Sequence, residues 1–340
     1  MLWFVGLGVS GFDSVPARGI DVLARADVVY LEQFTSPVPE RDVSRIRDVT
    51  GGKLVLAKRW QVEDGAEILK SAKDGEAVLL SYGDPYIATT HIELRTRAAA
   101  QGTATGAIHA SSALTAIVGE CGLHFYKVGR VATIMGGESF ATPYRTLYKN
   151  MAEGGHTILL LEYDQERDFF LDPSDALAGL LEAEKGQARR VIGESTYCII
   201  ASRIGSEDQR ITAGMISSLA GTDFGSPPHT VIIPGSLHFT ESDALGSTCR
   251  CVDAPAGNTV EKISAQMIAK YVPMVRAALE EAKSMYAGKY DDVLENAEMY
   301  IRDAEKFLAD GHDEVAVLSI GYADGLVDAL RMAGGLEPKM

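Results

Sequence analysis

Residues 79–94 have the sequence LLSYGDPYIATTHIEL, in which an apolar run stops at Gly83-Asp84-Pro85. Glycine permits backbone angles that other residues avoid, and proline cannot continue the pairing of a strand. The stretch therefore predicts a buried strand, residues 78–81, that ends in a sharp turn. Asp84 in this turn has two interpretations: it caps a helix that begins near Thr89 or Thr90, or it contacts a ligand.

A second stretch, LWFVGLGVSG at residues 2–11, matches the spacing of a dinucleotide-binding turn, and Glu32 lies where a ribose-binding acid is expected. In such a turn the helix starts within the glycines, which would put Pro16 inside it at a cost of about 3 kcal/mol. We therefore prefer Ser14 as the helix N-cap and Pro16 as an early helical residue. On this interpretation the glycines allow a ligand to approach the strand end.

Short apolar runs alternate with helical segments along the first 254 residues, as is typical of α/β units around mostly parallel sheets. The runs are LWFVGLG, DVVYLEQ, KLVLA, AVLLSYGDP, GAIHA, TILLLEYD, YCIIASRIG and TVIIPG. Five runs fill one layered domain, and a glycine-containing helical stretch follows. We expect two α/β domains, residues 1–107 and 108–254, and a C-terminal α-helical domain, residues 255–340.

The C-terminal region has helical periodicity. Three amphipathic stripes are expected to face the core of this domain. They comprise Ile263, Met267, Tyr271, Val275 and Leu279; then Val293, Ala297, Tyr300, Ile301, Ala304 and Leu308; and then Val315, Leu318, Tyr322, Leu326 and Leu330.

The chain has 340 residues and a net charge of -15, which argues against binding to nucleic acid or to an anionic membrane. No leader-like segment or apolar run of membrane-spanning length occurs, so we expect a cytoplasmic protein. The four cysteines lack a C-x-x-C pair and are expected to be reduced, and no metal site is indicated.

The turn after the first strand and the turn after the fourth together resemble the tetrapyrrole methylase superfamily, and the chain is similar within it to the diphthine synthase family. Tyr82 stands where that family more often has proline, and Ala113 follows Ser112 where a larger aliphatic residue is common. The segments that carry the resemblance are VGLG (5–8), FTS (34–36), GDPYIATTHIELR (83–95), IHASS (108–112), GLHFYKVG (122–129), RIGS (203–206) and DFGSPPHTVIIPGSLHF (223–239).

The resemblance implies that S-adenosyl-L-methionine is the cofactor and that it binds in a cleft between the two α/β domains. Carboxylate and hydroxyl groups would bond its polar edges, and aliphatic side chains would line an apolar cleft. His91 is a candidate for the wall of this site, with a structural role equally open. The implied cofactor contacts are Val9, Asp84, Ile87, Ser112, Ala113, Leu161, Ile204 and His229.

The function implied is methylation of the amino group of the modified histidine of translation elongation factor 2, in diphthamide biosynthesis. The resemblance further implies a homodimer, and the residue types do not identify the proton acceptor. Residues 265–335 resemble a small archaeal helical domain of unassigned function, which indicates an archaeal source. The alternatives are a tetrapyrrole C-methyltransferase, an NAD-binding oxidoreductase and a noncatalytic binding module.

Overall fold

The computed structural model describes residues 1–137, 139–164 and 167–337. It divides into two compact units, Met1–Thr259 and Val260–Met340, and each is described by itself. No helix of the described residues is both long and apolar enough to cross a membrane. All four cysteines are free in the structure.

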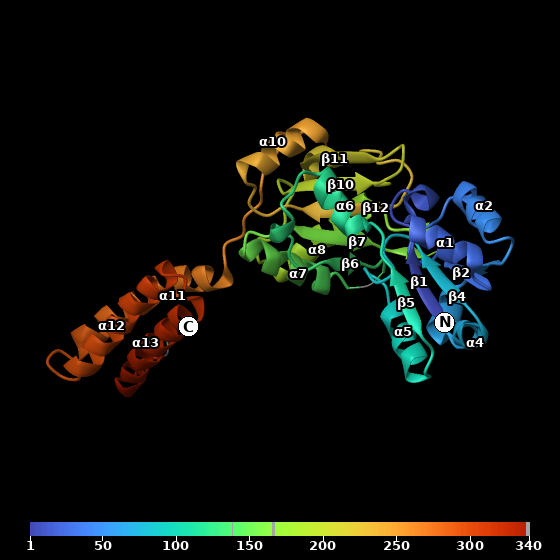
Figure 1. The fold of residues 1–340 in the computed structure, drawn as a ribbon. Coiled ribbons are helices and arrows are strands. Elements are labelled where there is room, and N and C mark those ends of the chain that lie inside the picture. Colours follow the sequence, from blue (N-terminus) through green and yellow to red (C-terminus); the bar gives the residue numbers. More distant parts are fainter. Residues whose placement is uncertain (138, 165–166, 338–340) are drawn as a thin grey trace. The chain divides into compact units, whose positions relative to one another are not determined.

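The first sheet of the larger unit has five parallel strands in the order β3-β2-β4-β1-β5 (Figure 1). All five predicted runs form its strands, and the central ones are apolar on both faces because helices cover both. The strands are β1 (Leu2–Gly6), β2 (Val28–Glu32), β3 (Leu54–Ala57), β4 (Ala77–Ser81) and β5 (Thr105–Ile108), and the helices are α1 (Ala17–Arg25), α2 (Glu40–Val49), α3 (Arg59–Asp64), α4 (Ala66–Asp74) and α5 (His91–Ala100), with a 3-10 turn η1 (Gly11–Ser14).

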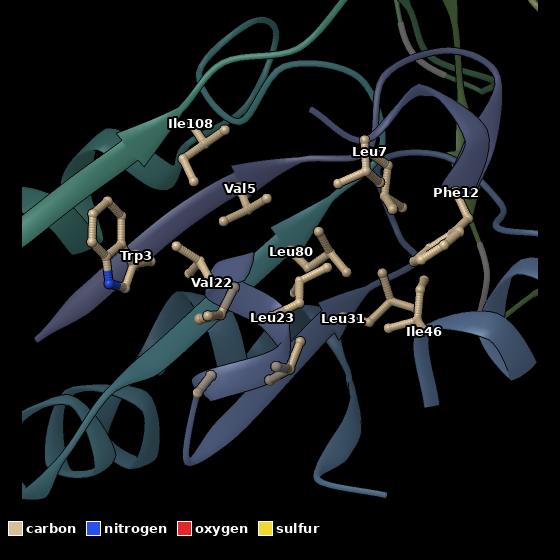
Figure 2. Close-up of a cluster of buried hydrophobic side chains, with 14 of the residues drawn as sticks. Trp3, Val5, Leu7, Phe12, Val22, Leu23, Leu31, Ile46, Leu80 and Ile108 are labelled. Atoms are coloured by element: carbon tan, nitrogen blue, oxygen red, sulfur yellow. The ribbon is translucent and has the colours of Figure 1, made fainter. Parts of the chain in front are cut away.

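One core of this sheet lies between its central strands and helices α1 and α2 (Figure 2). Val5 and Leu80, from neighbouring strands, are fully buried there beside Leu23 of α1 and Ile46 of α2. This packing fixes the level at which β1 and β4 end, and the turn that follows β4 forms one wall of the site.

The start of α1 differs from the prediction. Helix α1 begins at Ala17 with Pro16 as its N-cap residue, so Ser14 does not cap it. The Ser14 hydroxyl instead donates to the Leu7 carbonyl oxygen at 2.7 Å and accepts from the Ser10 N–H at 2.9 Å. A local side-chain bond to the preceding turn has thus replaced the expected cap.

The second sheet has six strands in the order β13-β11-β10-β12-β7-β6, and its central pairings are antiparallel, so the expectation of a mostly parallel sheet was wrong here. Residues 203–209 join β10 to β11 closely enough for a hairpin, whereas a parallel pair needs a long crossover. The strands are β6 (Ala132–Ile134), β7 (Thr157–Leu161), β10 (Tyr197–Ser202), β11 (Arg210–Met215), β12 (His229–Ile233) and β13 (Arg250–Cys251).

The connections of this second sheet include five helices, a short hairpin and a 3-10 turn, η2 (Phe125–Lys127). The hairpin, β8 (Tyr163–Asp164) with β9 (Phe169–Phe170), stacks Tyr163 on Phe170 with ring centroids 4.3 Å apart. The helices are α6 (Ala113–Glu120), α7 (Ala141–Ala152), α8 (Pro173–Gln187), α9 (Ile216–Leu219) and α10 (Phe239–Thr248).

The larger unit continues past the last strand to Thr259. The Asn258 side chain accepts from the Tyr197 N–H at 2.9 Å and donates to the carbonyl oxygens of Tyr197 and Pro234. The compact unit therefore ends five residues after the domain limit of 254 expected from sequence.

The smaller unit is a bundle of three helices, α11 (Ile263–Met285), α12 (Asp291–Ala309) and α13 (Asp313–Ala333), which lie side by side (Figure 1). The expected inner face of α13 was wrong at Val315, Leu318 and Tyr322, which are exposed, whereas Leu326 and Leu330 pack against the core as expected. Its buried face carries Ala316, Ile320, Ala323 and Val327, and the two alanines allow close packing of the helices.

Candidate functional site

The turns that follow β1 and β4 are bonded directly to each other. The Gly8 N–H donates to the Gly83 carbonyl oxygen at 3.1 Å, and the Gly83 N–H donates to the Gly8 carbonyl oxygen at 3.0 Å. A Cβ on Gly6 would lie 2.4 Å from the Gly83 oxygen. The first glycines thus serve contact between two turns of the chain, which corrects the expectation that they make room for a ligand.

Asp84 holds the second turn against the segment that follows β5. Its Oδ1 accepts from the Tyr86 N–H at 3.0 Å, and its Oδ2 lies 2.7 Å from Nδ1 of His109 and 3.3 Å from the Ala110 N. Helix α5 begins at His91 with Thr90 as its N-cap residue, so Asp84 does not cap it. Both oxygens already have partners within the chain, which the sequence did not indicate.

A cavity of about 360 Å³ is lined by residues of both sheets of the larger unit. Its walls include the turn after β4, the start of α6, the ends of β7 and β12, and the segment that follows β10. Seven of the eight predicted cofactor contacts line it: Asp84, Ile87, Ser112, Ala113, Leu161, Ile204 and His229. The structure therefore gathers distant motifs at one place, and their contact with a cofactor stays a prediction.

Val9 is the predicted contact that does not line the cavity. Its N–H donates to the Ser111 hydroxyl at 3.2 Å, and its carbonyl oxygen accepts from the Tyr82 hydroxyl at 2.5 Å. Burial raises the pKa of Tyr82 to about 12, so this hydroxyl keeps its proton. Tyr82, which departs from the family pattern, lines the cavity. Val9 is therefore connected to a residue of the cavity wall through this hydrogen bond.

Two predicted polar contacts also have structural partners. Ser112 is the N-cap of α6, with its hydroxyl oxygen 3.4 Å from the Thr115 N. His229 lies on β12 with Nδ1 2.8 Å from the Ser202 hydroxyl, and burial lowers the pKa of this imidazole. Both side chains are thereby fixed in orientation at the cavity wall.

Glu32 cannot serve as a ribose-binding acid. It is fully buried at the end of β2, and its Oε2 accepts from the N–H groups of Phe34 at 3.1 Å and Thr35 at 3.0 Å. Burial raises the pKa of Glu32 to about 7, opposed by these bonds and by the Arg59 charge. The carboxyl thus shapes the FTS segment instead of facing a nucleotide.

Sequence reasoning missed Arg59 and Tyr163 among the cavity residues. Arg59 comes from the first turn of α3 and lies 5.0 Å above the Phe34 ring, and Tyr163 comes from the β8–β9 hairpin. Neither element carries a motif, so no sequence signal pointed to them. Among the described residues no cluster of three or more histidine, cysteine, aspartate or glutamate side chains is suited to a metal ion.

The chain is similar in sequence to known proteins. Residues 1–220 match the family described as Tetrapyrrole (Corrin/Porphyrin) Methylases, and residues 270–336 match Protein of unknown function (DUF357). Diphthine synthase of Methanocaldococcus jannaschii is 34% identical over 255 residues, which are 73% of this chain and 99% of the relative. That of Methanosarcina mazei is 35% identical over 253 residues, 72% of this chain and 94% of the relative.

The fold agrees with the sequence comparison. A crystal structure of diphthine synthase superposes with a TM-score of 0.66 at 29% identity, covering 74% of this chain and 96% of that one. The relatives thus match almost from end to end, and residues 270–336, within the helical unit, match a separate family model. The chain belongs to the diphthine synthase family, with the fold of the tetrapyrrole methylases.

Proposed function

We propose that this S-adenosyl-L-methionine-dependent methyltransferase of diphthamide biosynthesis methylates the amino group of the modified histidine of translation elongation factor 2. The observation that carries the proposal is the cavity, which collects seven predicted cofactor contacts from distant parts of the sequence. Full-length similarity to diphthine synthases supports the same assignment.

The residues of the cavity fit the cofactor. Ile87, Leu161 and Ile204 offer apolar surface to an adenine ring and a methionyl chain, and Asp84 offers a carboxylate to polar groups. The first N–H groups of α6 have no intrahelical acceptor, so the Ala113 N–H would hold an anionic group there. An apolar pocket with a few fixed polar groups is what this cofactor requires.

The bound cofactor supplies a methyl group on a positively charged sulfur, which is already an activated leaving group. The protein's task is then to position the substrate nitrogen in line with the methyl carbon and to exclude water. Such alignment contributes up to about 7–11 kcal/mol of a barrier. Because an ammonium has no free electron pair, the substrate amine must lose a proton before it attacks.

The test is transfer of radiolabelled methyl groups from S-adenosyl-L-methionine to archaeal elongation factor 2 that carries the amine-bearing histidine. The matched control is elongation factor 2 with an unmodified histidine, which lacks the amine and is expected to stay unlabelled. Incorporation into the first alone supports the proposal. Absence of label from both proteins, with binding of S-adenosylhomocysteine intact by calorimetry, would direct the search to another substrate such as a tetrapyrrole.

The proposal includes a cytoplasmic enzyme from an archaeal cell that works as a homodimer. The archaeal origin of the similar diphthine synthases supports the source. Translation takes place in the cytoplasm, and this supports the location. The homodimer rests on family resemblance alone, and sedimentation equilibrium of the full chain tests it.

A further inference from the structure

His91, in the first turn of α5, has a defined protonation pattern. The residue is 1% exposed, and its Nδ1 lies 3.0 Å from the Pro85 carbonyl oxygen. A carbonyl oxygen only accepts hydrogen bonds, so Nδ1 carries the ring proton and Nε2 presents a lone pair. Burial lowers the pKa of His91 to about 4, which keeps the ring neutral at physiological pH.

That lone pair has no hydrogen-bond partner among the described residues, although His91 lines the cavity. A buried acceptor without a donor costs about 1–3 kcal/mol, so a group this well fixed calls for a partner from outside the chain. The His91 ring is held edge-on to the Phe34 ring, with centroids 6.5 Å apart at 86°. Its position therefore does not depend on the missing donor.

The surroundings of His91 distinguish it from the predicted cofactor contacts. The His91 ring packs against Phe34, over which the Arg59 guanidinium lies, and neither Phe34 nor Arg59 is a predicted cofactor contact. Burial and the Arg59 cation beside Phe34 favour a neutral amine over an ammonium, because desolvation and a nearby like charge both disfavour the charged form. An amine offers N–H donors, which is what a neutral imidazole nitrogen accepts.

We propose that Nε2 of His91 accepts an N–H hydrogen bond from the substrate amine and so orients the amine lone pair toward the methyl carbon. The inference rests on the proposed function and deepens it, since it names the residue that binds the nucleophile. The amine loses a proton to water before it is seated. Its lone pair forms the new N–C bond as the C–S bond breaks with its electrons passing to sulfur.

The decisive variant is His91→Phe, which keeps a ring and removes the lone pair. The Pro85 carbonyl oxygen keeps a donor in this variant, because the Thr89 hydroxyl bonds to it at 2.7 Å. We expect kcat/KM for elongation factor 2 to fall on the order of tenfold or more. Calorimetric affinity for S-adenosylhomocysteine is expected to stay within about twofold of the wild type.

Two further variants make the comparison specific. His91→Gln keeps an acceptor on a side chain of similar reach, and we expect it to recover part of the lost kcat/KM. His124→Phe, which alters a histidine outside the cavity lining, is expected to leave both measurements unchanged. An unchanged kcat/KM in His91→Phe would overturn the inference, and so would lost S-adenosylhomocysteine binding, which would assign His91 to the cofactor.

A measurement on the wild-type protein keeps the inference testable if the variant does not fold. In the complex with S-adenosylhomocysteine, the Nε2 nitrogen resonance of His91 should show an unprotonated nitrogen. It should shift when elongation factor 2 with the amine-bearing histidine is added, and not with the unmodified protein. If the Nε2 resonance shifts with neither form of elongation factor 2, the inference is overturned. The proposed function would still stand if the wild type transfers methyl groups.

Discussion

The buried carboxyl of Glu32 predicts an unusual dependence of stability on pH. Burial raises its pKa from the ordinary 4.5 to about 7 in the folded chain. Below pH 4.5 the group is protonated in both folded and unfolded chains and has no effect. As pH rises through the window from 4.5 to 7, the unfolded chain loses its proton more readily, so Glu32 lowers the stability of the fold.

The magnitude follows from the two pKa values. They differ by about 2.5, and one pKa unit corresponds to about 1.4 kcal/mol, so the loss is on the order of 3 kcal/mol at pH 8. Glu32→Gln has the same shape and does not titrate. Its free energy of unfolding, relative to the wild type, should therefore rise by about this amount between pH 4.5 and pH 8.

Thermal melting of both proteins at pH 5 and pH 8 measures the effect. A change of about 1 kcal/mol in the free energy of unfolding moves Tm by roughly 2–4 °C in a domain of this size. The difference in Tm between Glu32→Gln and the wild type should therefore change by roughly 6–12 °C from pH 5 to pH 8. His91, whose depressed pKa removes stability as pH falls from 6.5 toward 4, acts equally in both proteins. The matched control is Glu194→Gln, at an exposed glutamate of the same unit. A gap for Glu32→Gln that stays constant with pH would refute the reasoning.

Three other predictions concern the site, the unit boundary and the helical unit. In calorimetry, Asp84→Asn should bind S-adenosylhomocysteine about tenfold more weakly, and unchanged affinity would remove Asp84 from the site. The variant should also have a lower Tm, because an amide NH2 would face an N–H group of Tyr86 or Ala110 that now donates to the carboxylate. A chain that ends at Thr259 should keep cofactor binding and the Tm of the larger unit, whereas a chain that ends at Cys251 should have a lower Tm because it lacks the Asn258 hydrogen bonds. Equal Tm values for the two chains would show that residues 252–259 do not stabilise this unit. In urea unfolding of the full chain, Ile320→Ala should lower the free energy of unfolding by about 2–5 kcal/mol, whereas Leu318→Ala, at an exposed position, should change it by no more than about 0.5 kcal/mol. Similar changes in the two variants would contradict the buried face assigned to α13.

The first sheet was predictable because its strands are continuous apolar runs between turn residues. Strand β11 was missed because residues 210–215, RITAGM, mix polar and small side chains, and β6 is three residues long. The first half of the α13 face was assigned wrongly for a related reason. Ala316 and Ala323 are buried but small, and the larger Val315, Leu318 and Tyr322, which dominate a periodicity argument, point to solvent.

The candidate site was predictable where strand ends and motifs mark it, as at Asp84 and Ser112. The partners of those residues were not, because Asp84 and His109 are 25 positions apart and meet only through the fold. The protonation of His91 depends on the Pro85 carbonyl oxygen, and the raised pKa of Glu32 depends on burial. Such properties arise from three-dimensional contacts, on which a single sequence is silent.

The paired hydrogen bonds between Gly8 and Gly83 bear on how a ligand is received. Because each turn restrains the other, neither has much conformational entropy left to lose when a molecule binds beside them. Binding at this edge of the cavity is therefore association with a preorganised receptor, and little of the interaction energy is consumed in ordering the backbone. Specificity in such a receptor comes from shape and from the placement of a few polar atoms, since the surface does not adapt to a poorer ligand.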